Sequence, residues 1–207
     1  MVQKRVPEIV VSRLPVYLRA LSEMKATHRE ITSSQELGDR LGFSSAQIRK
    51  DLSQFGEFGK QGTGYNISFL LEQLERILRV DRVWDTALVG AGDLGHAVAN
   101  YGGFIHRGFR IAVVFDNDPR KIGTKAGEFT IQDTANMQEE IRKRGIKIAM
   151  LTVPAAAAQE LALRLVDAGV EAILCYAPTS ISVPGQIQVE YIDPVLHLQK
   201  MTYFIHE

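Results

Sequence analysis

The spacing of apolar residues changes along the chain, and this change predicts two domains. Over residues 1–80 apolar side chains recur every three or four positions, which is typical of amphipathic helices. We expect these helices over residues 12–24, 33–42, 44–55 and 67–80. Beyond residue 85, short apolar runs at 86–89, 110–115, 147–152 and 171–175 alternate with helical stretches at 94–101, 133–144 and 154–168. Such alternation predicts an α/β domain with a parallel sheet covered on both faces.

Two of the short helices carry a helix-turn-helix pattern. Each begins with capping-box spacing, a serine followed three residues later by Glu or Gln, and a glycine suited to a left-handed cap lies between them. Two short helices joined by such a turn are typical of DNA-binding proteins. The residues concerned are Ser33 with Glu36, Ser44 with Gln47, and Gly42.

The second of these helices has an apolar and a cationic face. Burying its apolar positions turns two cations and a hydroxyl outward, where they suit phosphates and base edges. The solvated face of an ordinary helical hairpin is the alternative that the pattern leaves open. The apolar positions are Ile48, Leu52 and Phe55, and the outward ones are Arg49, Lys50 and Ser53.

The next segment favours the DNA-binding interpretation. Residues 55–65 hold four glycines and three aromatic residues among eleven positions. Glycines permit positive φ and close backbone approach, and aromatic residues suit short paired strands, so we expect a hairpin. With Lys60 and Gln61 near its tip, this hairpin would be the wing of a winged helix, and helix 67–80 would close the module. A flexible loop is the alternative.

A glycine fingerprint opens the second domain. Residues 90–95 read Gly-Ala-Gly-Asp-Leu-Gly between strand 86–89 and helix 94–101. In dinucleotide-binding folds the first glycine permits the turn, the second lets the pyrophosphate approach the backbone, and the third lets helix and strand pack closely. Amides at the helix start then bind phosphate. We expect a dinucleotide at Gly90, Ala91, Gly92, Asp93, Leu94 and Gly95, with purely structural glycines as the alternative.

A carboxylate bears on the choice of dinucleotide. Asp116 closes strand 110–115 at the distance beyond the fingerprint where an acid accepts hydrogen bonds from the adenosine ribose. It would repel a 2′-phosphate, which favours NAD(H) over NADP(H). Arg120 and Lys121 could neutralise such a phosphate, although Pro119 and these two cations also suit the start of a solvated helix.

Composition and charge exclude several classes of protein. The 207 residues have zero net charge, but residues 1–80 carry 12 Lys and Arg against 9 Asp and Glu, and the remainder carries 12 against 15. Cys175 is the only cysteine, the sequence opens without a signal-peptide pattern, and no apolar run approaches the length of a membrane-spanning helix, so we expect a cytoplasmic protein away from membranes. The histidines form neither acid/base pairs nor metal-ligand spacings, and the segment 176–207 after Cys175 is too short for a catalytic domain. We therefore expect neither an enzyme nor a metal site.

The C-terminal segment predicts a protein partner. Residues 187–191 alternate like a strand, and Asp193 with Pro194 then suits the start of a helix. The apolar residues after Pro194 spread around the whole helix and not along one stripe. A helix that is apolar on every side must be buried on every side, and in so short a chain a second copy is the expected cover.

Taken together, these motifs resemble the Rex family of redox-sensing transcriptional repressors over nearly the whole chain. The fold class implied is α/β, with a winged-helix DNA-binding domain at 1–80, a Rossmann NAD(H)-binding domain at 81–192 and a domain-swapped C-terminal helix at 193–207. The motifs are residues 12–14 and 17–19, 34–37, 49–53, 55–65, 90–95, 115–119, 151–154, 177–178 and 192–193.

The resemblance implies a homodimer that binds palindromic double-stranded operator DNA and is released by NADH, with NAD+ competing, so that it reports the NADH/NAD+ ratio. Tyr101 and Phe104 then fall at the nicotinamide end, Thr152 and Pro154 fall in the cofactor site, and Arg19 and Asp193 fall where they couple the domains. A coenzyme-A-binding module and a degenerate dehydrogenase are the alternatives. The implied DNA contacts come from a helix-turn-helix region at about 17–56 and from the wing: Ser44, Arg49, Lys50, Ser53, Gly59, Lys60 and Gln61.

Overall fold

The computed structural model describes residues 6–59 and 63–205. The chain divides into two compact units, Met1–Arg82 and Val83–Glu207, so the division falls two residues after the boundary expected at residue 80. A short joint connects them: Arg79 ends the first unit's last helix in the left-handed region, and the Val80 amide still donates to the Glu75 carbonyl. The Trp84 amide already donates to Gly108 in the second unit.

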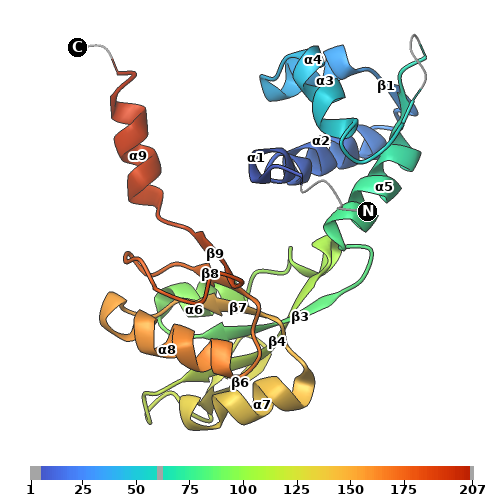
Figure 1. Cartoon of the computed structure of the whole chain (residues 1–207). Helices are drawn as coiled ribbons and strands as arrows, with labels where there is room; N and C mark the ends of the chain where they lie inside the picture. The colour runs from blue at the N-terminus through green and yellow to red at the C-terminus, as the bar shows by residue number, and fades with distance from the viewer. Residues whose placement is uncertain (1–5, 60–62, 206–207) are drawn as a thin grey trace. The chain divides into compact units, whose positions relative to one another are not determined.

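The first unit is a helical module closed by a small sheet (Figure 1). Its buried core is made mainly by apolar residues of α2, α3, α4 and α5, with Leu14, Leu37, Ile48 and Leu70 fully buried. The elements are α1 (Glu8–Val11), α2 (Leu14–Ala26), β1 (Ile31–Thr32), α3 (Ser34–Leu41), α4 (Ser45–Leu52), β2 (Tyr65–Asn66) and α5 (Ile67–Leu78).

Serine caps begin both helices of the helix-turn-helix, as the sequence predicts. The hydroxyls of Ser33 and Ser44 each accept a hydrogen bond from the amide three residues on, and Gly42 ends α3 with φ 73°. The return half of each capping box is absent from the described contacts, because Glu36 accepts from Thr32 and Gln47 donates to Asp51 instead. Helix α4 ends at Leu52, three residues earlier than expected. The amides of Gln54 and Phe55 donate to carbonyls three residues earlier, and not four as in an α-helix.

The predicted wing is only partly what the structure contains. Its strand Tyr65–Asn66 pairs antiparallel with Ile31–Thr32, and not with the arm beginning at Phe55. The two arms still approach each other, because a Cβ added at Gly59 would lie 2.6 Å from the Gly64 carbonyl oxygen. Lys60 and Gln61, the expected tip, lie outside the described residues.

The second unit is a seven-stranded sheet in the order β5-β6-β4-β3-β7-β8-β9. All neighbours are parallel except the edge strand β5, and the six parallel strands have the order 3-2-1-4-5-6 of the dinucleotide-binding Rossmann fold. The strands are β3 (Trp84–Val89), β4 (Phe109–Asp116), β5 (Lys125–Ala126), β6 (Phe129–Asp133), β7 (Ile148–Leu151), β8 (Ala172–Cys175) and β9 (Gln188–Tyr191).

Helices cover both faces of this sheet, as expected for a parallel sheet (Figure 1). Alternate residues of β3 face opposite sides: Ala87 and Val89 pack with α7 (Met137–Arg144) and α8 (Ala155–Asp167), whereas Leu88 packs with α6 (Asp93–Ala99). Strands β5 and β6 and the short 3-10 helices η1 (Ile105–Arg107) and η2 (Thr134–Asn136) were not predicted. The helix start that Pro119, Arg120 and Lys121 offered as an alternative does not form, because residues 119–122 form turns in which the amides of Lys121 and Ile122 donate to the Asp118 carbonyl.

Helix α9 (Pro194–Thr202) begins where the sequence predicts and is uncovered within the described chain. The Asp193 carboxylate caps it by accepting from the Val195 amide, and none of its described residues is buried. The large apolar residues of this segment, which are 54% to 84% exposed, are Val195, Leu196, Leu198, Met201, Tyr203, Phe204 and Ile205. Across residues 6–59 and 63–205, no helix is both long and apolar enough to cross a membrane.

Candidate nucleotide-binding and DNA-binding sites

A cleft of about 410 Å³ opens at the carboxyl ends of β3, β4 and β7. The sheet order reverses between β3 and β7, and ligands of open α/β sheets bind at such a switch point. Five of the eleven predicted cofactor residues line it, and they come from three loops: Gly90, Gly92, Asp116, Thr152 and Pro154. The cleft is lined by Val89, Gly90, Gly92, Asp116, Asn117, Asp118, Lys121, Thr134, Thr152, Val153, Pro154, Ala157, Glu160, Leu161 and Arg164.

The three fingerprint glycines serve different purposes. Gly90 has φ 102°, and a Cβ there would lie 2.6 Å from the Thr152 carbonyl oxygen. At Gly95 a Cβ would lie 1.9 Å from the Gly90 carbonyl oxygen, so this glycine lets α6 pack against the end of β3. A Cβ at Gly92 would meet no described atom within 4 Å. The fold therefore requires the first and third glycines, while the space above Gly92 suits a group that approaches the backbone from outside.

The Asp116 carboxylate holds the glycine loop in place. It is 6% exposed, and it accepts from the Ala91 amide at 2.7 Å, the Asp118 amide at 2.8 Å and the Lys121 ammonium at 3.1 Å. Burial alone would raise the pKa of this carboxyl, but these donors lower the pKa below its ordinary value. A charged Asp116 thus orders the loop directly, a role that the sequence analysis did not anticipate.

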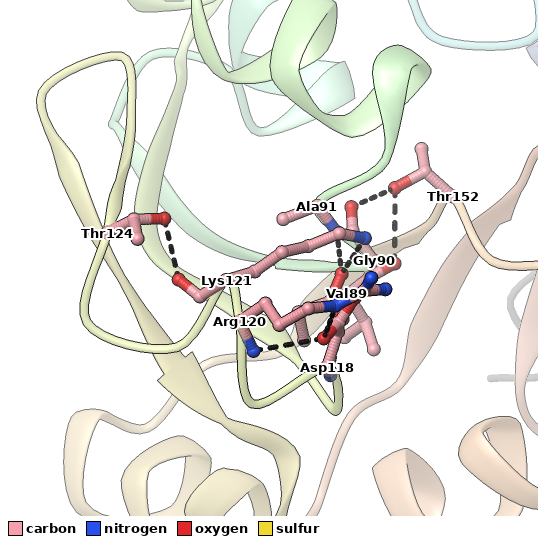
Figure 2. Close-up of polar contacts among 9 residues, drawn as sticks. Val89, Gly90, Ala91, Asp118, Arg120, Lys121, Thr124 and Thr152 are labelled. Atoms are coloured by element: carbon pink, nitrogen blue, oxygen red, sulfur yellow. Dashed lines mark hydrogen bonds and ion pairs between the residues drawn. The ribbon is translucent and has the colours of Figure 1, made fainter.

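Neighbouring side chains complete the mouth of the cleft. Figure 2 shows the Thr152 hydroxyl bridging the Val89 and Gly90 carbonyl oxygens, which ties the ends of β3 and β7 together. Arg120 pairs with Asp118 and holds the pKa of that carboxyl at about 2. Arg120 and Lys121 are therefore both paired with carboxylates of the same turn, Arg120 with Asp118 and Lys121 with Asp116.

Part of the cleft was missed by the sequence analysis. Thr134 lies just beyond β6, a strand that was not predicted, and its carbonyl accepts from Arg164. Ala157, Leu161 and Arg164 recur at helical spacing along α8 and line the same side. That spacing was visible in the sequence, but only the sheet topology shows that this face of α8 borders the cleft.

Tyr101 and Phe104 lie elsewhere in the described chain. Their rings pack edge to face with centroids 5.0 Å apart, and they line a separate hollow of about 280 Å³ beside Phe109 and Phe129. The structure of one chain thus does not bring them to the fingerprint glycines, and their place at the nicotinamide end stays a prediction.

The cationic face of α4 borders a groove in the first unit. Arg49 and Lys50 are exposed, and Arg49 donates to the Ser34 hydroxyl at 3.0 Å. Burial raises the pKa of Tyr65, and the nearby Arg49 cation opposes that rise. The groove, of about 940 Å³, is lined by Ser33, Ser34, Arg49, Leu52, Ser53, Gly56, Glu57, Phe58, Gly59, Gly64 and Tyr65.

Two other predicted DNA contacts lie at the ends of α4, and the two predicted coupling residues belong to different units. Ser44 caps α4, and the Ser53 hydroxyl donates to the Lys50 carbonyl at its far end. Arg19 is exposed on α2 with Glu23 at 4.0 Å, whereas Asp193 caps α9 in the other unit. Among the described residues, no three His, Cys, Asp or Glu side chains gather as metal ligands would.

Fold and sites together define a two-unit protein in which a Rossmann dinucleotide cleft is joined to a helix-turn-helix module. Comparison with family models agrees: residues 81–179 match the model described as "CoA binding domain", and residues 5–53 match "Putative DNA-binding protein N-terminus". The chain belongs to the Rex family of redox-sensing transcriptional repressors. It is 52% identical to the Rex repressor of Roseiflexus sp. (strain RS-1) over 96% of this chain and 90% of that protein. It is 42% identical to the Rex repressor of Brevibacillus brevis over 98% of both chains.

Solved structures extend the likeness to three dimensions. The crystal structure of RSP with β-NAD+ and operator DNA superposes with a TM-score of 0.92 at 37% identity, covering 97% of this chain and 93% of that one. The structure of RSP with β-NADH superposes with a TM-score of 0.88 at 35% identity, covering 96% and 93%. Members of this family are transcriptional repressors and not enzymes.

Proposed function

We propose that this protein is a repressor that binds operator DNA through α4 and leaves it when NADH occupies the cleft at Gly92. The observation that carries the proposal is the likeness, over 97% of this chain, to RSP, a Rex-family repressor that was solved with both β-NAD+ and operator DNA. The open space above Gly92 supports it, because the fold leaves room where a pyrophosphate would approach. Acting on DNA, the protein would work in the cytoplasm and report the NADH/NAD+ ratio.

We further propose that the working form is a homodimer on a palindromic operator. The exposed apolar residues of α9 support this, since a second copy would cover them. An exchange of α9 between protomers would carry Asp193 of one protomer towards the partner and place it to act on Arg19, which would couple cleft and DNA-binding unit. The cofactor site would then comprise the fingerprint residues, Asp116, Thr152 and Pro154, with Tyr101 and Phe104 at the nicotinamide end.

In the first step of the test, the protein enriches its preferred sequence, the selected duplex, from a pool of random duplexes. Binding of that duplex is then followed by fluorescence anisotropy while NADH, NAD+, NADPH or coenzyme A is added. We expect NADH to weaken binding by about 5- to 150-fold, and the selected duplex to weaken NADH binding by the same factor. The absence of an enriched duplex, or an NADH affinity that is the same with and without DNA, would contradict the proposal.

Coenzyme A is the second candidate ligand, because the family model covering residues 81–179 bears its name. The carboxylates of Asp116 and Asp118 in the cleft disfavour its 3′-phosphate. Release of the selected duplex by coenzyme A and not by NADH would select this alternative.

A further inference from the structure

A buried carboxylate on the inner side of α4 remains unexplained by DNA or nucleotide binding. Asp51 is 1% exposed, although it follows the exposed Lys50 directly in the sequence. Its Oδ2 accepts from Arg13 Nε at 2.6 Å and from the Tyr17 hydroxyl at 2.7 Å. Its Oδ1 accepts from Arg13 Nη2 at 2.8 Å and from Gln47 Nε2 at 2.6 Å.

This network joins two helices by directional contacts. Arg13 is the N-cap residue of α2 and Tyr17 lies in its first turns, whereas Gln47 and Asp51 are one turn apart on α4. The planar fork of Arg13 meets both carboxylate oxygens, a geometry that restricts angle as well as distance. A single hydrogen bond or an apolar contact would leave α4 freer to turn about its own axis.

Stability alone does not account for such a network. Replacing a buried ion pair with apolar residues of similar volume is often neutral or stabilising. Helix α4 is already anchored in the core by Ile48, which is fully buried, and by Leu52, which is 3% exposed. The contacts of Asp51 therefore add orientation to a helix that apolar burial already holds.

Orientation matters because of what lies on the other side of α4. If α4 rotates slightly about its own axis as a rigid body, the outward side chains of Arg49 and Lys50 are displaced together. Contacts to base edges carry the sequence information and contacts to phosphates do not, so a displacement of side chains that reach base edges changes discrimination between sequences.

We propose that Asp51 is a positioning residue for DNA recognition: by fastening α4 to Arg13 and Tyr17 of the α2 segment, it sets the rotation at which α4 presents Arg49 and Lys50. The inference rests on the proposed function, in which α4 reads DNA. It predicts that Asp51 acts on sequence discrimination and not on general attraction to DNA.

The experiment uses the whole 207-residue chain and its Asp51→Asn variant. Both are titrated with the selected duplex and with a scrambled duplex of equal length and composition, at the same salt concentration. We expect the variant to lose at least tenfold in affinity for the selected duplex, to stay within about twofold for the scrambled one, and to bind NADH as the parent does. A merely structural role would lower both DNA affinities by the same factor, in parallel with the melting temperature.

Two further variants keep the test decisive. Asp39→Asn removes one exposed acid of α3 outside the network, and it should leave discrimination unchanged. The triple variant Arg13→Met, Tyr17→Phe and Asp51→Leu replaces the ion pair and the buried hydroxyl that contacts it by apolar side chains, so it should remain folded and yet discriminate poorly. Parent-like discrimination by this folded triple variant, or by Asp51→Asn, would overturn the inference. A parent protein that does not distinguish the two duplexes would instead refute the proposed function.

Discussion

Gly92 offers the sharpest separation of folding from cofactor binding. No described atom lies within 4 Å of a Cβ built at this position, and its φ of −79° is open to any residue. Gly92→Val weakens the N-cap position of α6 by about 1 kcal/mol. The restricted unfolded chain returns part of that, about 0.4–1 kcal/mol. The free energy of unfolding should therefore change by less than about 1 kcal/mol.

Binding should respond very differently. The valine side chain would occupy the space that a pyrophosphate needs beside the loop from Gly90 to Gly95, so we expect at least about 100-fold weaker NADH binding, about 2.8 kcal/mol. Isothermal titration measures the affinity, and thermal unfolding checks the fold. The variant should still bind the selected duplex, but NADH should no longer release it.

Two other glycines calibrate this result. Gly185→Val adds the same side chain at an exposed position with open space around its Cβ, outside the residues that line the cleft, and should leave NADH binding unchanged. Gly95→Ala places a Cβ 1.9 Å from the Gly90 carbonyl oxygen and should disturb the loop and lower the melting temperature. If Gly92→Val stayed folded and bound NADH as tightly as the parent, the cleft would not be the cofactor site.

The remaining predictions concern other parts of the chain. Lys50→Ala should weaken binding of the selected duplex by about 1–3 kcal/mol and leave NADH binding intact. An unchanged affinity for the selected duplex would exclude α4 as the helix that recognises DNA. Asp116→Ala should weaken NADH binding and reduce the preference for NADH over NADPH. Equal affinities of the parent protein for NADH and NADPH would contradict the argument that the Asp116 charge repels a 2′-phosphate. Deleting residues 194–207 should give a monomer by light scattering, whereas a dimeric product would show that another surface holds the copies together. Burial would raise the pKa of Asp51, but its hydrogen bonds, first among them those from Arg13, keep that pKa below the ordinary value. Its stabilising effect is therefore complete above about pH 4 and is lost as the pH falls through the folded-state pKa, so acid should destabilise Asp51→Asn less steeply than the parent in urea unfolding.

The long, strongly patterned elements were predictable from the sequence. The apolar runs became β3, β4, β7 and β8, because a strand buried on both faces needs almost nothing but apolar residues. The serine caps of α3 and α4 were also predictable, because a cap depends on residues that are only three positions apart. The glycine fingerprint predicted the loop after β3, which lines one side of the cleft through Gly90 and Gly92.

What the sequence concealed depends on contacts between distant segments. Strand β2 pairs with residues 31–32, more than thirty positions away, and a two-residue strand has no period to detect. Strand β6 mixes Phe129 and Ile131 with polar residues near the edge of the sheet, where burial demands less of the sequence. Gln47 matches a capping box, but its side-chain amide donates to the Asp51 carboxylate one turn further along α4. Strands β2 and β6 thus depend on partners distant in sequence, and the side chain of Gln47 depends on a carboxylate that pairs with Arg13 of another segment.

The joint between the two units limits how they can move. Three residues, 81–83, separate Val80, whose amide donates to the Glu75 carbonyl at the end of α5, from Trp84, whose amide donates to the Gly108 carbonyl at the start of β3. A tether of three residues spans at most about 11 Å even when fully extended. The end of α5 and the start of β3 therefore cannot separate as the ends of a long linker do. Lengthening the joint by a few glycines would remove that limit while leaving the core and the site residues of each unit unchanged.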